Sequence, residues 1–144
     1  MSSVTTSLVV RRTFRASAER LFAAWTEPSQ LQAWWGPAGV TCPHAEVDLR
    51  VGGRYRIRNE MQDGDTLWIE GEFEQIERPR LLVYTWRTDK ATTPAERVTV
   101  QFEPRADKTE VIITHERVTD ELTRKQHEAG WIGCLDGLAV HVAD

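Results

Sequence analysis

The sequence predicts an α+β fold in which a curved, seven-stranded antiparallel sheet wraps around a long C-terminal helix, with two short helices after the first strand. Apolar and polar side chains alternate in successive segments as far as residue 116, and a period of two is typical of strands. From residue 119 to about residue 142, apolar side chains instead recur at helical spacing. A chain of 144 residues has the usual size of one domain with one hydrophobic core, so we expect a single domain over residues 1–144.

The N-terminal segment predicts one strand and two short helices. Alternation over Leu8–Arg15 predicts the strand. Ser17 stands where a serine hydroxyl would cap a helix over 18–26, by accepting a hydrogen bond from a free backbone N–H. Pro28 suits the first turn of a second short helix, and the glycines and proline of 36–39 are expected to end it.

Six further strands are expected after these helices. Gly52 and Gly53 indicate a hairpin between the first two. Strands joined by short turns pair in antiparallel fashion, which predicts one meander. The expected ranges are 46–51, 54–58, 67–74, 81–87, 98–102 and 111–116.

The last segment predicts a long amphipathic helix. Its apolar stripe is spaced by four, four, three and four residues and consists of His127, Trp131, Leu135, Leu138 and Val142. Gly130 and Gly133 each cost a helix roughly 1 kcal/mol against alanine, which indicates close approach of another element or room for a large side chain. A twisted sheet curls around such a helix, and incomplete closure leaves a cavity between them.

Composition and charge argue against several classes of partner. The chain carries 18 basic and 22 acidic residues, a net charge of −4, which disfavours nucleic acid and anionic membranes. No stretch is apolar enough to span a membrane, and residues 1–6 lack the apolar core of a signal peptide, so we expect a cytoplasmic protein. Cys42 and Cys134 are expected to be free thiols, and no cofactor is expected.

Motifs distributed over nearly the whole chain carry a family resemblance. They are Arg12–Phe14, Ala16–Phe22, Ala24–Pro28, Leu31 with Trp34–Pro37, Asp48–Gly53 with Tyr55, Gly71 with Phe73, Leu82–Trp86, and His127–Trp131 with Leu135 and Leu138. In these segments the chain resembles the helix-grip domains of the START-like (Bet v 1-like, SRPBCC) superfamily. More closely, it is similar to small bacterial homologues of the activator of the heat-shock-protein-ninety ATPase.

The resemblance implies a pocket between the sheet and the C-terminal helix. Members of the superfamily bind lipids, sterols, hormones or polyketides, and a few are cyclases or hydrolases. We expect nine residues to line the pocket: Trp35, Tyr55, Ile57, Phe73, Trp86, Phe102, His127, Trp131 and Leu135. The alternative is that these large side chains meet and fill the space. Trp25 is expected in the core, and His127 is either a satisfied core residue or a polar group in the pocket.

Catalytic and metal-binding motifs are absent from the sequence, so no catalytic residue and no metal ligand is assigned. Cys42 and His44 offer two ligands where zinc needs three or four. Two charged rows are expected to form cross-strand ion pairs: Arg54, Arg56 and Arg58 on one strand, and Glu70, Glu72 and Glu74 on the next. His115 and His141 are expected at the surface.

Three functions are compatible with these features. The preferred one is a non-enzymatic domain that binds an apolar or aromatic small molecule in the central pocket. The second is a module that docks on a chaperone, with the arginine row as the candidate surface. The third is an enzyme of cyclase or hydrolase type, in which His127 or a carboxylate moves a proton. Exposed sheet edges would permit a homodimer.

Overall fold

The computed structural model describes residues 6–36, 39–91 and 94–143. It contains the predicted series of elements in the predicted order. These are β1 (Thr6–Phe14), α1 (Ala18–Thr26), α2 (Pro28–Trp34), β2 (Thr41–Val47), β3 (Arg54–Glu60), β4 (Thr66–Glu77), β5 (Leu81–Thr88), β6 (Glu96–Arg105), β7 (Lys108–Val118) and α3 (Glu121–Val142).

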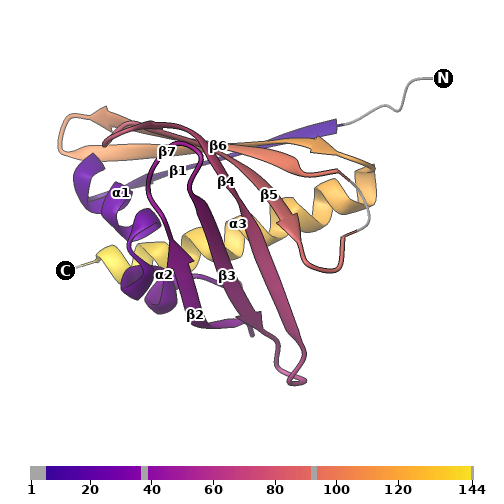
Figure 1. Ribbon diagram of the computed structural model, residues 1–144. Coiled ribbons are helices and arrows are strands. Elements are labelled where there is room, and N and C mark those ends of the chain that lie inside the picture. The colour runs from indigo at the N-terminus through magenta and orange to yellow at the C-terminus, as the bar shows by residue number, and fades with distance from the viewer. Residues whose placement is uncertain (1–5, 37–38, 92–93, 144) are drawn as a thin grey trace.

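The seven strands form one antiparallel sheet in the order β1-β7-β6-β5-β4-β3-β2. The strands from β2 to β7 follow chain order, and β1 adds beside β7. Figure 1 shows α3 crossing one face of the curved sheet, with α1 and α2 beside the C-terminal end of α3. The α+β fold predicted from the sequence is confirmed.

The helices begin where the sequence predicts. Ser17 Oγ accepts a hydrogen bond from the backbone N–H of Arg20 at 3.0 Å, and Asp120 does the same for Thr123 at 2.8 Å. Pro28 occupies the first turn of α2, where its missing N–H costs nothing. These caps fix the ends of the helices that pack on the sheet.

The prediction for β2 is wrong in its bounds: the strand covers Thr41–Val47 rather than 46–51. The register shifts between Thr41 and His44, around Pro43. A proline lacks the N–H that a central strand needs, but β2 is an edge strand and tolerates it there. Residues 48–53 instead form the turn into β3. A Cβ on Gly53 would lie 2.1 Å from the carbonyl oxygen of Asp48, so this turn requires glycine.

Tryptophans fill one end of the space between α3 and the sheet. Trp25 is buried, as predicted, and its ring lies 5.0 Å from that of Trp34. Trp35 lies 5.5 Å from Trp34 and 5.6 Å from Trp131, measured between ring centroids. This cluster joins α1 and α2 to α3.

Two glycines of α3 have different surroundings. A Cβ on Gly137 would lie 2.6 Å from the carbonyl oxygen of Trp34, so α2 and α3 approach closely there. A Cβ on Gly130 would meet no described atom within 4 Å. The space at Gly130 fits the alternative of room for a large side chain, and a close approach of α2 occurs at Gly137.

Candidate functional site

The tryptophans leave two unequal spaces between the sheet and α3. The smaller has a volume of 20 Å³, which is room for about one water molecule. It is lined by Trp25, Leu31, Trp35, Val47, Tyr55, Ile57, Ile69, Phe73, Tyr84 and Trp86. In this half of the expected pocket, large side chains fill the space, as in the alternative to an open pocket considered above.

The larger space has a volume of 160 Å³ and is partly open to solvent. It lies between α3 and the ends of β3, β4 and β5. Its walls are mainly apolar and comprise Trp35, Val40, Asn59, Met61, Leu67, Ile69, Trp86, Gln126, His127, Gly130, Trp131 and Cys134. We refer to it as the α3 cavity.

The nine residues expected to line a pocket are divided by these two spaces. Trp35 and Trp86 line both. The α3 cavity also includes His127 and Trp131, and the small space includes Tyr55, Ile57 and Phe73. Phe102 and Leu135 line neither, because they are packed in the core. Their contact with any ligand stays a prediction.

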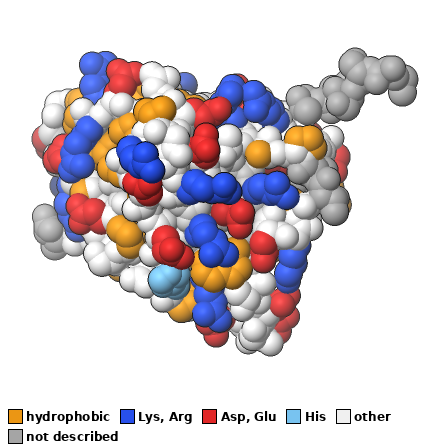
Figure 2. Space-filling view, viewed as in Figure 1, with side chains coloured by type: hydrophobic (Ala, Val, Ile, Leu, Met, Phe, Trp, Pro, Cys, Tyr) orange, Lys and Arg blue, Asp and Glu red, His pale blue; other side chains and the backbone are white. Residues whose placement is uncertain are grey.

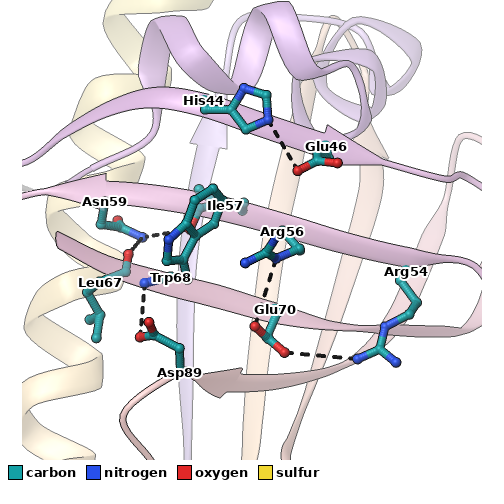
Figure 3. A network of polar contacts seen from close by, with 10 residues as sticks. All are labelled: His44, Glu46, Arg54, Arg56, Ile57, Asn59, Leu67, Trp68, Glu70 and Asp89. Atoms are coloured by element: carbon teal, nitrogen blue, oxygen red, sulfur yellow. Dashed lines mark hydrogen bonds and ion pairs between the residues drawn. The ribbon is translucent and has the colours of Figure 1, made fainter.

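Asn59 is a cavity residue that sequence reasoning missed. Its Oδ1 accepts a hydrogen bond from Trp35 Nε1 at 2.9 Å. Its Nδ2 donates to the carbonyl oxygens of Ile57 and Leu67 (Figure 3). Asn59 therefore fixes the orientation of the Trp35 indole in the cavity wall. The signal was available, because Asn59 shares the inward-facing parity of Tyr55 and Ile57 on β3.

A buried polar cluster adjoins the α3 cavity. Glu96 opens β6, His115 lies on β7, and His127 projects from α3. Glu96 Oε1 lies 2.6 Å from His115 Nε2 and 3.0 Å from His127 Nε2. The two imidazole rings stack with centroids 4.6 Å apart. We call these three residues the Glu–His–His cluster.

The prediction that His115 is a surface residue is wrong, because its side chain is fully buried. Its position is fixed by the alternation of β7, where Val111 and Ile113 also face inward. A buried imidazole needs partners on both nitrogens, and Glu96 and Trp131 supply them. His141 is half-buried beside Gln30, at 3.2 Å.

Hydrogen bonds determine which nitrogens of the cluster carry hydrogen. Trp131 Nε1 can only donate, and it donates to His115 Nδ1 at 3.0 Å. The hydrogen of neutral His115 therefore sits on Nε2 and is donated to Glu96. Burial would raise the pKa of Glu96, but the hydrogen bonds from both histidines and their charge lower it to about 2. Glu96 is thus an anion that accepts two N–H bonds.

Burial lowers the pKa of His115, although Glu96 opposes this effect. His115 is consequently neutral near pH 7. A neutral His115 fits the bond from Trp131, since a protonated imidazole would present two N–H groups and lose that contact. Between Glu96 and His115, the fixed charge is the negative charge on Glu96.

The ligating atoms of the Glu–His–His cluster lie within 4.8 Å of one another, which brings together three groups that could hold a metal ion. Coordination by His115 Nε2 would need the hydrogen to move to Nδ1. There it would face the N–H of Trp131. Metal-binding histidines usually donate their second N–H to an acceptor, and here a donor occupies that place. The bonding pattern thus favours a proton network over a metal site.

Trp86 joins the cluster to the cavity. Its ring lies 5.0 Å from His115 and 4.8 Å from His127, edge to face. Its Nε1 is buried and has no hydrogen-bond partner among the described residues. A buried donor left unpaired costs on the order of 1–3 kcal/mol.

The outer face of β2–β4 carries the charged rows predicted from the sequence. Arg54 and Arg56 lie 4.0 Å and 3.9 Å from the Glu70 carboxylate, and Arg56 also covers the ring of Trp68 (Figure 3). Glu74 pairs instead with Arg97. Figure 2 shows acidic and basic side chains interspersed over this face. The expected cross-strand ion pairs are confirmed for Arg54 and Arg56 with Glu70.

The two cysteines are free thiols, as expected. Cys42 is buried while His44 is exposed and bonds to Glu46 at 3.2 Å, so the two do not converge on a common ligand position. Cys134 lines the α3 cavity, and burial raises its pKa to about 12. It is a neutral, apolar part of the wall near pH 7.

Comparison with known proteins gives the same architecture. A family model described as activator of Hsp90 ATPase homolog 1-like protein matches residues 15–143. A crystal structure from Chromobacterium violaceum superposes with a TM-score of 0.88 and 27% identity, over 96% of this chain and 98% of that chain. The crystal structure of an AHSA1 protein from Silicibacter pomeroyi superposes with a TM-score of 0.85 and 24% identity, over 95% of this chain and 97% of that chain.

An AHSA1-like protein from Aeromonas hydrophila superposes with a TM-score of 0.78 and 24% identity, over 95% of this chain and 92% of that chain. A search of curated protein sequences returned no significant match. Among the described residues, no helix is both long and apolar enough to cross a membrane.

Proposed function

The chain belongs to the family of activator of Hsp90 ATPase homolog 1-like proteins, which have the SRPBCC helix-grip fold, and from this premise we propose that it binds a small, ring-sized apolar molecule in the α3 cavity. The observation that carries the proposal is the cavity itself. Its 160 Å³ are walled by three tryptophans, Trp35, Trp86 and Trp131, in an otherwise close-packed interior.

The volume sets the size of the ligand. An apolar cavity of roughly 150 Å³ in a protein core accommodates one benzene molecule. Pockets for drug-sized ligands are larger, about 300–1,000 Å³. The α3 cavity therefore suits one aromatic ring with short substituents that reach toward solvent. Sterols and polycyclic polyketides, which the superfamily resemblance includes, are too large for the space that the tryptophans leave.

The apolar walls supply the affinity. Burial of apolar surface contributes about 25 cal/mol per Å², and flat rings gain further from edge-to-face contact with indoles. Asn59 holds Trp35 in place by the hydrogen bond described above, so the wall is preorganised. Preorganisation reduces the free-energy cost of ordering side chains on binding.

The test uses 4-fluorotoluene as the probe, followed by ¹⁹F NMR. Gly130→Leu places a branched side chain in the cavity without a backbone clash, because a Cβ at Gly130 meets open space. We expect this variant to weaken binding by roughly tenfold or more. The matched control is Ala129→Leu, one residue away on the exposed side of α3, which should bind like the unmodified chain.

Saturable binding that Gly130→Leu removes and Ala129→Leu retains supports the proposal. Binding that both variants retain places the probe elsewhere and overturns it. The proposal is also overturned if oleate or cholesterol binds and 4-fluorotoluene does not, because the binding site would then be larger than the α3 cavity. Thermal unfolding of each variant confirms that the chain is folded.

A further inference from the structure

The cavity wall contains one basic nitrogen that no other group uses, on His127. Its Nε2 bonds to Glu96 at 3.0 Å, and its Nδ1 has no hydrogen-bond partner in the described parts of the chain. Because Glu96 is ionised and can only accept, Nε2 of His127 must carry the donated hydrogen. In the neutral ring, this leaves the lone pair on Nδ1.

His115 cannot take the same role. Both of its nitrogens are engaged, Nε2 with Glu96 and Nδ1 with Trp131. It is fully buried and does not line the cavity. The cluster thus contains two imidazoles, of which only His127 can receive a proton from a bound molecule. His115 acts as a second fixed donor to Glu96.

We propose that His127, oriented by Glu96, accepts a proton from an acidic hydroxyl group of the ligand, so that the α3 cavity selects phenols over rings without a hydroxyl. This inference rests on the proposed function and names its ligand class. In the transfer, the ligand O–H bond breaks, its electron pair stays on oxygen, and an N–H bond forms at Nδ1. The products are a phenolate and an imidazolium paired with the Glu96 carboxylate.

The surrounding charges define this balance. Glu96 from β6 contacts His127 directly, and His115 from β7 stacks on the ring as a neutral group. Arg87 of β5 and Lys90, which follows this strand, line the outer depression that His127 also borders. Glu96 is the only one of these groups in hydrogen-bond contact with His127 among the described residues, so its effect is the largest.

Trp86 packs beside the proton acceptor, with its ring against His127 in the same wall. Its Nε1 is buried, so the ligand oxygen is assigned to His127 and not to this indole. A phenolate oxygen bonded to the imidazolium gains a charge-assisted hydrogen bond, which is roughly twice as strong as a neutral one. A ring without a hydroxyl group gains no such bond.

The experiment compares 4-nitrophenol with 4-nitroanisole, which has the same ring and lacks the acidic hydrogen. The visible absorbance of nitrophenolate reports the ionisation of the bound phenol directly. We expect 4-nitrophenol to bind roughly tenfold more tightly near neutral pH, with its pKa lowered in the complex. His127→Gln keeps a donor for Glu96 but has no basic nitrogen, and should abolish both effects.

Glu96→Gln is the second variant. Its amide oxygen can still accept from both histidines, while the negative charge is removed. We expect it to bind 4-nitroanisole normally and to reduce the pKa shift of bound 4-nitrophenol. Equal affinity for the two rings, or an unshifted nitrophenol in the complex, overturns the proton transfer and leaves the apolar cavity standing. Binding of neither ring overturns the proposed function, and the proton transfer with it.

Discussion

Trp131 donates its indole N–H to Nδ1 of His115 at 3.0 Å, and this bond decides which hydrogen the buried imidazole offers to Glu96. The three residues of the Glu–His–His cluster have the composition of a metal site. Because of the bond from Trp131, however, His115 presents an N–H group rather than a lone pair to Glu96, and the cluster is a set of donors around one carboxylate. Trp131, a side chain of the cavity wall, thus determines which nitrogen of His115 carries the hydrogen.

Trp131→Phe should change the ligand chemistry of the cluster. The substitution removes the donor that faces His115 Nδ1, so the hydrogen can move there and free Nε2 for coordination. We expect Zn²⁺ to raise the melting temperature of the variant and to leave that of the unmodified chain unchanged. Thermal unfolding with and without Zn²⁺ measures this. Zinc binding by the unmodified chain, with His115 as a ligand, would contradict the tautomer assigned here.

Acid should destabilise the fold in two stages. The pKa of His115 is lower in the folded state than its ordinary value of 6.5, so the stability that its neutral form supplies is present above pH 6.5 and decreases below it. The pKa of Glu96 is lowered from 4.5 to about 2, so its contribution is lost as pH falls through that window. The Glu96 stage contributes on the order of 3 kcal/mol.

Chemical denaturation at a series of pH values tests this dependence, and Glu96→Gln is the comparison. The variant should lack the loss of stability between pH 4.5 and 2 that belongs to Glu96. If its pH profile parallels that of the unmodified chain in this window, then Glu96 is not the anion of the cluster.

Alanine substitutions at two glycines of α3 should have opposite effects. Gly130→Ala meets open space and gains helix propensity, which should stabilise the fold by about 0.5–1 kcal/mol. Gly137→Ala would bring a Cβ to 2.6 Å from the carbonyl oxygen of Trp34 and should destabilise the fold, because α2 must move away. Urea unfolding of the two variants provides the comparison, and changes of the same sign would show that the packing of α2 on α3 is misassigned.

The arginine row on the outer face should contribute little to stability. Arg54 and Arg56 are solvent-exposed and lie near the limit of ion-pair distance from Glu70. Exposed pairs of this kind contribute about 0–1 kcal/mol. Arg54→Ala and Arg56→Ala should therefore leave the free energy of unfolding, measured by urea denaturation, nearly unchanged.

The same two variants test the predicted chaperone contact. In a pull-down with a bacterial Hsp90-type chaperone, docking on the arginine row predicts that the variants are captured less than the unmodified chain. Equal capture would show that this surface is not the docking site.

The fold was predictable because each element carries its own period. The inward positions of β6 alternate strictly, and the stripe on α3 has helical spacing. The start of β2 was not predictable in this way, because the irregular register around Pro43 breaks the alternation. The ion pairs on β3 and β4 followed from their matching parity.

Strand parity alone would have placed two residues of the Glu–His–His cluster inside the fold. Glu96 shares the inward parity of Val98, and His115 that of Ile113. Charged residues are rarely buried unless they are paired, which favours a surface assignment when each residue is considered alone. Their pairing depends on β6 lying beside β7 and on α3 crossing both, which involves residues distant in sequence. The size of the cavity depends likewise on how tryptophans from separate elements meet.

The most direct test of the account is a crystal structure of the chain with 4-nitrophenol bound. We predict density for one ring between Trp35, Trp86 and Trp131, with the phenol oxygen beside His127 Nδ1. A ring bound elsewhere, with the α3 cavity closed by the movement of a tryptophan, would contradict the claim that this cavity is the binding site.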